Sequence, residues 1–339
     1  MPLKLAIIGC GAIAEQGHLP GAAESEKVEV TLLVDRLEAR RKQLCDQFGV
    51  AHNSNSITDV TKYADAAVVA TPPGSHVPIA CGLIEMGMPV LLEKPIALSS
   101  AECETLLSLA KEKNVLVAAG MTRRFFRSDR MVREYIRSSV LGKLVSFNVE
   151  NGYDYAWSSA SNFILSKAQA GGGVLMGLGS HVLDSLIWML GDPIAFEFEC
   201  DSEGGIESEC KVHLTMAGGA KGCVELSRSR NLENRYLFEF EKGTIYAPFY
   251  GDNVSVSLAG SELTLNGRSV PAGSPYAEVQ SVAKIMSQEL DDFADAVIEG
   301  KPPMATGEDA MKSIALIDGC YASPKILDFP WMQPIEGTS

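Results

Sequence analysis

The hexapeptide GCGAIA at residues 9–14 constrains the fold of this chain more than any other feature of its sequence. It follows a short apolar run (residues 3–9) and opens a stretch of helical composition (residues 12–24), so it matches G-x-G-x-x-A between a strand and a helix. In that pattern the first glycine permits a tight turn, and the second lets the backbone approach a pyrophosphate at the helix N-terminus. The sequence therefore predicts a dinucleotide-binding βαβ unit whose cofactor contacts include Gly9, Gly11, Ala12 and Ile13.

An acidic residue ends the second strand-like run, VEVTLLVD, at Asp35. A carboxylate at this spacing suits the ribose hydroxyls of the adenosine half of the cofactor. It would repel a 2′-phosphate, so NAD is favoured over NADP. Arg36 comes next, and an arginine there can accommodate that phosphate, so NADP stays open. Arg40 and Arg41 lie one turn further on and are expected on a solvated helix face.

Strand-like and helix-like segments alternate over the first 120 residues. The near-continuous apolar character of the strands predicts a parallel sheet covered by helices on both faces. The expected strands after the first two are 65–73, 88–95 and 115–120, and the expected helices are 38–49, 74–87 and 99–114.

From about residue 127 the pattern changes to a helix (128–139), a longer alternating strand (144–155) and several strand-like runs separated by glycine turns. Two helices, about 280–299 and 307–323, end the chain. We therefore expect an α/β protein with an N-terminal Rossmann domain (1–122), built on a doubly wound parallel sheet. A C-terminal α+β domain (123–339) with a large open, mostly antiparallel sheet should follow it. The last helix is placed where it can pack back on the Rossmann domain.

Composition excludes several classes of partner. Forty-three acidic residues against 29 basic ones give a formal charge of −14, which opposes binding to nucleic acid and to anionic membranes. The eight cysteines are scattered, without CxxC or zinc-like spacing, so we expect reduced thiols, no metal site and a cytoplasmic protein. Residues 171–191 are apolar with one charged side chain, Asp184, but their glycines favour a buried helix over a membrane span.

Five motifs occur in a fixed order along the chain: GCGAIA (9–14), ATPPGSH (70–76), EKP (93–95), GMTRRF (120–125) and GGGVLMGLGSHVLD (171–184). This combination resembles the Gfo/Idh/MocA oxidoreductase family over nearly the whole length. The resemblance implies an NAD(P)-dependent dehydrogenase or reductase that acts on a hydroxyl or carbonyl of a sugar, cyclitol or related polyol. It also implies a homodimer or homotetramer formed through the C-terminal sheet.

On this resemblance Lys94 binds the reacting oxygen and His181 is the general acid/base. An ammonium can stabilise negative charge that develops on an oxygen, and imidazole has a pKa near neutrality. Hydride would pass between the substrate carbon and the nicotinamide. The cofactor is also expected to contact Lys94 itself and four residues around it: Thr71, Pro72, His76 and Glu93.

Gly177 is the main departure from the family pattern, which has an aspartate four residues before the histidine. Residues i and i+4 share a helix face, so the missing carboxylate would have lain beside His181. His181 could act alone, or Asp154 or Glu150 could replace the carboxylate. Alternatively, turnover is lost and the chain is a non-catalytic cofactor-binding sensor or regulator. An NAD-using glycosidase is a further, minor alternative, and Asp184 is expected to be structural.

Contacts to the substrate are expected from residues near the domain junction and from the strand that opens the second domain. Arg123 follows the last Rossmann strand, and its alternative role is an interdomain salt bridge. An aromatic and acidic cluster after residue 152 suits the C–H faces and hydroxyls of a sugar, or else contacts a neighbouring subunit. The predicted substrate-side residues are Arg123, Tyr153, Asp154, Trp157 and Gly177.

Overall fold

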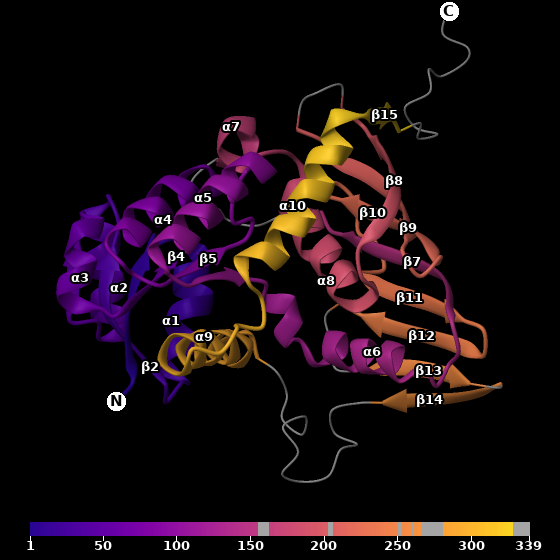
Figure 1. The fold of residues 1–339 in the computed structure, drawn as a ribbon, viewed down its shortest axis with the longest axis horizontal. Coiled ribbons are helices and arrows are strands. Elements are labelled where there is room, and N and C mark those ends of the chain that lie inside the picture. Colours follow the sequence, from indigo (N-terminus) through magenta and orange to yellow (C-terminus); the bar gives the residue numbers. More distant parts are fainter. Residues whose placement is uncertain (155–162, 203–205, 250–252, 259, 266–280, 328–339) are drawn as a thin grey trace, which may run out of the picture.

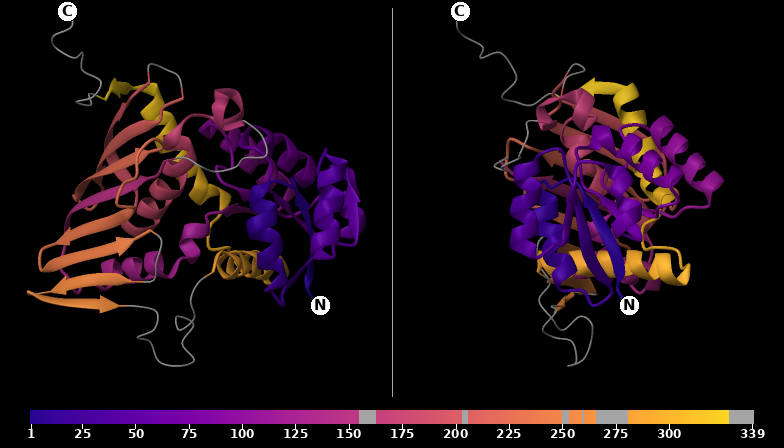
Figure 2. Two further views of the ribbon diagram at one scale, coloured as in Figure 1. Left: turned by 180° about the vertical axis from the view of Figure 1, so that it is seen from behind. Right: turned by 90° about the vertical axis from the view of Figure 1, so that its left-hand side faces the viewer.

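The computed structural model describes residues 1–154, 163–202, 206–249, 253–258, 260–265 and 281–327. Within them two sheets lie side by side, with helices between and around them (Figures 1 and 2). The predicted fold class, a parallel doubly wound sheet followed by a large, mostly antiparallel sheet, is confirmed.

The first sheet has six parallel strands in the order β3-β2-β1-β4-β5-β6. The strand order reverses between β1 and β4, and ligands of open α/β sheets bind at such a switch point, beyond the carboxyl ends of the strands. The strands are β1 (Leu3–Ile8), β2 (Val28–Val34), β3 (His52–Ser54), β4 (Ala66–Val69), β5 (Val90–Glu93) and β6 (Val117–Gly120).

Helices cover both faces of this sheet, as its buried strands require (Figure 2). The segment after the glycine loop is not one regular α-helix, because a π-helical turn, η1 (Ala14–His18), precedes α1 (Leu19–Ala23). The other elements are α2 (Glu38–Phe48), η2 (Ile57–Asp59), α3 (Val60–Tyr63), η3 (Pro73–Ser75), α4 (His76–Glu85) and α5 (Ser100–Lys113).

The second sheet has nine strands in the order β14-β13-β12-β11-β7-β10-β9-β8-β15. The pairs β7–β10 and β8–β15 are parallel and the remaining pairs are antiparallel. The strands are β7 (Leu144–Gly152), β8 (Pro193–Cys200), β9 (Glu209–Met216), β10 (Lys221–Ser227), β11 (Arg235–Phe240), β12 (Gly243–Pro248), β13 (Val254–Leu258), β14 (Ser261–Leu265) and β15 (Pro324–Ile326).

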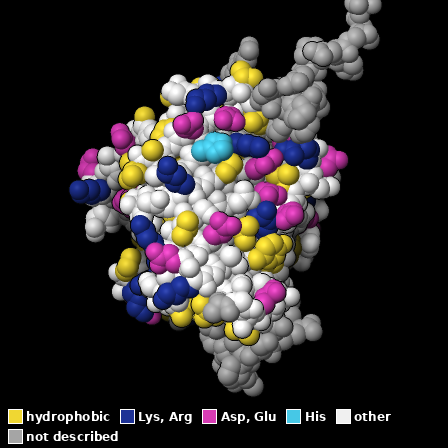
Figure 3. Space-filling view, turned by 90° about the vertical axis from the view of Figure 1, so that its right-hand side faces the viewer, with side chains coloured by type: hydrophobic (Ala, Val, Ile, Leu, Met, Phe, Trp, Pro, Cys, Tyr) yellow, Lys and Arg dark blue, Asp and Glu magenta, His cyan; other side chains and the backbone are white. Residues whose placement is uncertain are grey.

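Helices lie on one face of this second sheet and leave the other face open (Figure 1). The helical segments between the sheets are η4 (Thr122–Phe125), α6 (Arg127–Ser138), η5 (Phe163–Leu165), α7 (Lys167–Ala170), the π-helical turn η6 (Leu175–Gly179) and α8 (Ser180–Leu190). The open face carries exposed apolar side chains such as Tyr246 of β12 together with many charged ones (Figure 3). Oligomerisation through this sheet remains a prediction.

The last two helices return to the first sheet. α9 (Val282–Glu299) packs on η1 and α1 so closely that a Cβ on Gly21 would lie 2.6 Å from the Cβ of Met286. α10 (Gly307–Ala322) packs between α5 and α8. The backbone N–H of Ala119 in β6 donates a 3.0 Å hydrogen bond to the carbonyl oxygen of Ala305, which lies just before α10.

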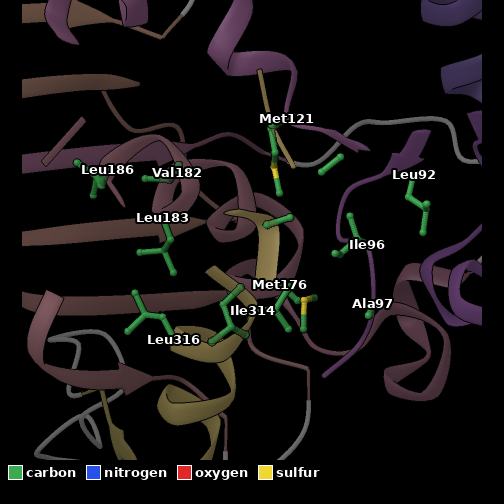
Figure 4. Packing of buried hydrophobic residues seen from close by; sticks show 14 of the residues in the cluster. Leu92, Ile96, Ala97, Met121, Met176, Val182, Leu183, Leu186, Ile314 and Leu316 are labelled. Carbon is green, nitrogen blue, oxygen red and sulfur yellow. The ribbon is translucent and has the colours of Figure 1, made fainter. Parts of the chain in front are cut away.

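One continuous apolar core joins the two sheets (Figure 4). This core includes Leu92 of β5, Met121 directly after β6, Met176 of η6, Leu183 of α8 and Ile314 of α10. Because interiors are close-packed, this shared core fixes how residues at the end of the first sheet face those on α8.

The helical run Lys167–Leu190 is the one segment in the described part of the chain that is long and apolar enough to cross a membrane. Most of it is buried within the fold, which is the environment of a core helix. All eight cysteines are free thiols, as the sequence predicts.

Candidate active site

The glycine loop has the geometry that close approach of a cofactor requires. Gly9 has φ +100°, and a Cβ there would lie 2.6 Å from the carbonyl oxygen of Ala70, so only glycine fits. Around Gly11, by contrast, a Cβ would meet no atom within 4 Å, which leaves its backbone open on the side beyond the strands. Ala12 and Ile13 are partly exposed beside it. These residues fit a dinucleotide pyrophosphate at the start of η1.

Asp35 lies at the end of β2 and holds the glycine loop in place. Its carboxylate accepts hydrogen bonds from the backbone N–H of Cys10 (2.8 Å) and of Leu37 (2.8 Å). Each carboxylate oxygen has a second lone pair, so these bonds leave capacity for ribose hydroxyls. Arg36 is exposed at the next position.

The expectation of a solvated face for Arg40 and Arg41 is wrong. Arg40 Nε donates to the carbonyl of Cys10 over 2.8 Å and its guanidinium pairs with Glu15 at 2.6 Å. Arg41 is buried and donates to the backbone carbonyl of Asp35. Arg40 therefore braces the glycine loop at Cys10, and Arg41 braces the end of β2 at Asp35, because these backbone carbonyls need donors.

His76 connects the loop after β4 to the EKP turn after β5. It is fully buried, with Nδ1 2.9 Å from the carbonyl oxygen of Pro95 and Nε2 2.6 Å from that of Thr71. Burial lowers the pKa of this imidazole. Both ring nitrogens lie against backbone carbonyls, and the neutral ring can donate to one of them, so His76 is a positioning residue between the two turns. Thr71 is partly exposed and Pro72 exposed at the same edge.

Glu93 is buried, and its carboxylate points toward η1. Its Oε1 is 2.8 Å from Nε2 of the fully buried His18 on η1, and its Oε2 accepts from the backbone N–H of Lys94 at 3.2 Å. The buried Glu289 of α9 completes a cluster with His18 and Glu93 whose ligand-type atoms lie within 4.8 Å of one another. Neither carboxylate oxygen of Glu289 has a hydrogen-bond partner among the described residues.

Protons explain this cluster better than a metal ion. The 2.8 Å separation of His18 and Glu93 is that of a hydrogen bond. Burial and the nearby carboxylates of Glu93 and Asp292 raise the pKa of Glu289 well above its usual value, so it is a neutral acid. The pKa of Glu93 is lowered: burial raises it, but the hydrogen bond and charge of His18 outweigh that effect. The cluster anchors the strand end that carries Lys94.

Lys94 reaches from the EKP turn, whose Lys94–Pro95 peptide is cis, to the second domain. Its Nζ donates a 3.0 Å hydrogen bond to the carbonyl oxygen of Gly177 on η6. Burial, together with the positive charges of Arg228 and Arg123, lowers its pKa to about 8, against the opposing effect of Glu93. The ammonium is therefore the main form at pH 7, and it can give up its proton within the physiological range.

His181 lies in the first turn of α8, one turn after Gly177. It is partly exposed, and its Nδ1 is buried with no hydrogen-bond partner among the described residues. Burial, then the charges of Lys94 and Arg123, lower its pKa well below the usual value. The imidazole is accordingly neutral at pH 7 and able to accept a proton.

Two of the three glycines before η6, Gly172 and Gly173, are explained by packing. A Cβ on Gly172 would lie 2.6 Å from Cζ of Tyr321, and one on Gly173 would lie 2.5 Å from the backbone nitrogen of Glu207. The buried carboxylate of Glu207 accepts from the backbone N–H groups of Gly173 (3.0 Å) and Leu175 (2.9 Å), and from the hydroxyl of Tyr321 (2.8 Å). Glu207 thereby satisfies orphan donors at the helix start and fixes the helix that carries His181.

Gly177 is explained differently, because a charged side chain occupies the space beside it. A Cβ on Gly177 would lie 3.2 Å from Cζ of Arg228 and well inside contact distance of its Nη2. Arg228 follows β10, next to β7 in the sheet. The family pattern places a carboxylate at position 177. In this protein the guanidinium of Arg228 occupies the space that such a side chain would need.

The two arginines at the domain junction have different roles. Arg124 forms a buried two-point ion pair with Asp184 of α8 (2.9 and 2.7 Å) and also reaches Asp309 of α10 at 3.0 Å. This confirms a structural role for Asp184. Arg123 is buried with its guanidinium 3.9 Å from the ring centroid of Phe249, near enough to Lys94 and His181 to lower the pKa of each.

Among the expected substrate residues beyond residue 152, Tyr153 is half-buried and its N–H donates to the carbonyl of Ser227 at 3.4 Å. Asp154 is exposed, and Trp157 lies outside the described residues. Glu150 pairs with Arg235 over 2.9 Å within the sheet. In the described part of the chain, therefore, neither Asp154 nor Glu150 contacts His181 in place of the missing carboxylate.

Sequence reasoning missed several residues that shape the site: His18, Glu207, Arg228 and Glu289. Each is polar and meets its partners only through the tertiary fold, so no local spacing marks it. His18 follows Gly11 by seven residues, but this spacing alone indicates no function. Its role becomes visible only when the fold places Glu93 beside His18.

Two family models match this chain. The model described as oxidoreductase family, NAD-binding Rossmann fold, matches residues 3–121, and the GFO/IDH/MocA C-terminal domain model matches residues 130–246. The rhizopine catabolism protein MocA of Rhizobium meliloti is 24% identical over 322 residues, which cover 93% of each chain.

Solved structures agree with this assignment at the level of the fold. The aldose-aldose oxidoreductase of Caulobacter crescentus has a TM-score of 0.84 at 24% identity and covers 95% of this chain and 97% of its own. A levoglucosan dehydrogenase in complex with NADH and levoglucosan has a TM-score of 0.85 at 20% identity, over 95% and 96%. With both domains matched and the cofactor loop built as described, this chain belongs to the Gfo/Idh/MocA family of NAD(P)-dependent oxidoreductases, which act on CH–OH groups.

Proposed function

We propose that this enzyme transfers hydride between a nicotinamide cofactor, NAD in preference to NADP, and a hydroxyl or carbonyl carbon of a sugar, cyclitol or related polyol. The observation that carries the proposal is the hydrogen bond from Lys94 of the first domain to the carbonyl of Gly177, one helical turn before His181 of the second domain, whose pKa the charge of Lys94 lowers. The bound nicotinamide would supply or accept the hydride.

Lys94 binds the reacting oxygen. Its ammonium donates hydrogen bonds, and in the reduction direction it stabilises the negative charge that grows on that oxygen. A carbonyl oxygen, that of Gly177, already accepts from Lys94 Nζ, so the ammonium has further donors to aim at a substrate.

His181 moves the hydroxyl proton. Because its pKa is lowered by burial and by Lys94, the neutral ring can accept that proton during oxidation and return it during reduction. Its buried Nδ1 has no described carboxylate partner, so orientation of the ring depends on packing in α8. The experiment below tests above all whether His181 is active without the aspartate that the family pattern places at position 177.

The preference for NAD is supported by the acid at the end of β2. Asp35 keeps its carboxylate at the loop, and Arg40 and Arg41 are engaged with backbone and Glu15. Arg36 is exposed beside Asp35, and it is the residue that could bind the 2′-phosphate of NADP. Sugar dehydrogenases among the relatives favour the substrate class.

The experiment is substrate-driven reduction of NAD and of NADP by the purified protein, across sugars, cyclitols and sugar acids. Lys94→Ala should bind NADH as the parent does but lose turnover by about 10²–10³-fold, the size of effect of removing one oxyanion donor. Lys312→Ala, an exposed lysine of α10, is the control and should turn over normally. Turnover untouched in Lys94→Ala would refute the mechanism. Tight cofactor binding without turnover of any compound would favour the sensor or regulator that Gly177 suggests.

A further inference from the structure

An ion pair between Glu15 and Arg40 lies against the glycine loop. Glu15 is the second residue of η1, directly after the loop, and Arg40 is the third residue of α2. The guanidinium Nη2 lies 2.6 Å from one carboxylate oxygen of Glu15, and Nη1 donates to the other over 3.4 Å. The pair therefore connects the helix that follows the loop to the helix that follows β2.

The same guanidinium lies close to the acid that is proposed to bind the ribose. Arg40 Nε donates to the carbonyl oxygen of Cys10 over 2.8 Å, and the backbone N–H of Cys10 donates to the carboxylate of Asp35, also over 2.8 Å. The thiol of Cys10 responds to both charges, because burial and then Asp35 raise its pKa while Arg40 acts to lower it. The positive charge of Arg40 is thus part of the surroundings of the ribose position.

The donors of Arg40 are nearly all engaged. A guanidinium has five N–H groups. Nε binds the carbonyl of Cys10, Nη1 binds Glu15 and the side-chain oxygen of Gln43 (3.0 Å), and Nη2 binds Glu15. Among the described contacts, one Nη2 donor remains. Arg40 therefore cannot turn its fork toward a new anion unless it leaves Glu15.

The difference between the two cofactors lies at this place. NADP carries a phosphate on the 2′ oxygen of the adenosine ribose, and a phosphate monoester has about two negative charges at neutral pH. A phosphate there would meet the carboxylates of Asp35 and Glu15, and it would need cations with donors to spare. Arg36 is exposed beside Asp35, whereas Arg41 is buried and donates to the backbone carbonyl of Asp35. Arg40 is the second guanidinium on this side of the loop, and Glu15 already holds it.

We infer that Glu15 is a specificity-determining residue for the cofactor: by pairing with Arg40 it keeps that guanidinium from binding a 2′-phosphate, and so favours NAD over NADP. The inference rests on the proposed function and explains its preference for NAD. Discrimination is thereby shared between two carboxylates. Asp35 offers acceptors to the ribose hydroxyls, and Glu15 neutralises the cation that NADP needs.

The test is fluorescence titration of the purified protein with NADH and with NADPH, which needs no sugar. The ratio of the two Kd values should favour NADH in the parent. Glu15→Gln should shift that ratio toward NADPH about tenfold, the effect of one hydrogen bond to a charged group. Glu15→Asp keeps the charge and should keep most of the preference. Glu26→Gln, an exposed acid before β2, is the control and should leave the ratio within about twofold.

The shift must depend on Arg40. In an Arg40→Gln background, where no guanidinium is released, Glu15→Gln should leave the ratio unchanged. An equal shift with and without Arg40 would mean a general effect of charge, and equal weakening of both cofactors would mean that Glu15 only supports the loop. A shift no larger than that of Glu26→Gln would mean no role in selection. Each of these three results overturns the inference.

Other outcomes separate this inference from the proposed function. If NADPH binds the parent as tightly as NADH, the proposed preference for NAD fails, but a tenfold shift in Glu15→Gln that requires Arg40 still supports the role of Glu15. If both cofactors bind as expected and no sugar turns over, hydride transfer fails and the binding result for Glu15 stands. A parent protein that binds neither cofactor overturns both.

Discussion

The ammonium of Lys94 donates a 3.0 Å hydrogen bond to the backbone carbonyl of Gly177, and this bond joins the catalytic turn of the first domain to the helix of the second. Each residue depends on its own domain for position. Lys94 follows the buried Glu93–His18 pair, and Gly177 lies in the helix that Glu207 fixes at its start. The site is therefore assembled across the shared core that orients the two sheets (Figure 4).

Activity in the reduction direction should fall above pH 8. The pKa of Lys94 is lowered to about 8 by burial and by Arg228 and Arg123, so the charged donor disappears as pH rises past that value. We expect kcat/KM for a keto-sugar to decline about tenfold per pH unit on this limb, since it reports the free enzyme. In Lys94→Arg, which stays charged, any residual activity should lack the limb. A limb at the same pH in that variant would assign it to another group.

Lys94 should also lower the free energy of unfolding of the protein. Its pKa is lowered in the folded state from 10.5 to about 8, so the charged form is disfavoured by folding. The cost is complete below pH 8, where both states are protonated, and disappears as pH rises toward 10.5. Lys94→Met should therefore raise the free energy of unfolding at pH 7 by about 1–3 kcal/mol while abolishing turnover. Denaturant unfolding at pH 7 checks this, with Lys312→Met as control; a destabilised Lys94→Met would contradict it.

The ion pair between Arg124 and Asp184 should be the electrostatic contact to which stability is most sensitive. Both side chains are about 97% buried or more and make two hydrogen bonds with each other. Asp184→Asn removes the fully buried charge partner and leaves the guanidinium only its second pair, with the partly exposed Asp309, so it should cost about 3 kcal/mol. Asp192→Asn breaks the exposed pair with Lys312 and should cost under about 1 kcal/mol. Equal losses in the two variants, measured by urea unfolding, would show that burial is not the cause.

The glycine run offers a test of close packing. Gly173→Ala would place a methyl group against the backbone of Glu207, which cannot move without breaking its bonds to the helix start. We expect a loss of about 3 kcal/mol and a drop in activity, because the helix that carries His181 shifts. Gly218→Ala, in a turn where a Cβ meets nothing within 4 Å, should change stability by less than about 1 kcal/mol. Matching melting temperatures for the two variants would disprove the packing explanation.

Most of the fold could be predicted because its signals are local. Apolar strands that alternate with helices, and a glycine loop followed by Asp35, specify the first sheet, and Gly9 adopts the positive φ that the motif requires. Short elements such as β3 and β15 were missed, since three residues carry no periodicity. The buried setting of Arg41 also escaped prediction, because charge alone favours a solvated face until the carbonyl of Asp35 is placed beside it.

The candidate site was predictable only where motifs mark it. Lys94 and His181 follow from EKP and from the glycine-rich segment, and the structure places both near Gly177. The environment that sets their pKa values was not predictable. Arg228 and Glu207 lie 51 and 30 residues from Gly177 in the sequence and meet the helix through the sheet. Tertiary pairing of polar groups leaves no local pattern, so it waits for the fold.

The buried acid of α9 should make stability depend on pH in a direction opposite to that of a salt-bridged carboxylate. Burial, with Glu93 and Asp292 nearby, raises the pKa of Glu289 well above 4.5, so the folded protein holds a proton that the unfolded chain releases. Its contribution is present at low pH and is lost as pH rises from 4.5 through the raised folded value. Glu289→Gln keeps the shape of the neutral acid without titrating.

The free energy of unfolding of Glu289→Gln should therefore match that of the parent near pH 5 and exceed it at pH 8. At pH 8 the folded parent is destabilised, because Glu289 must either stay protonated or be buried as a charge, whereas the glutamine of the variant does not titrate. Urea unfolding at the two pH values measures the difference, and Glu112→Gln on the exposed side of α5 serves as the control. A Glu289→Gln protein that loses stability equally at both pH values would mean that the carboxyl is ionised and bound, as in a metal site with His18 and Glu93. In that case chelator should destabilise the parent protein and leave Glu289→Gln unchanged.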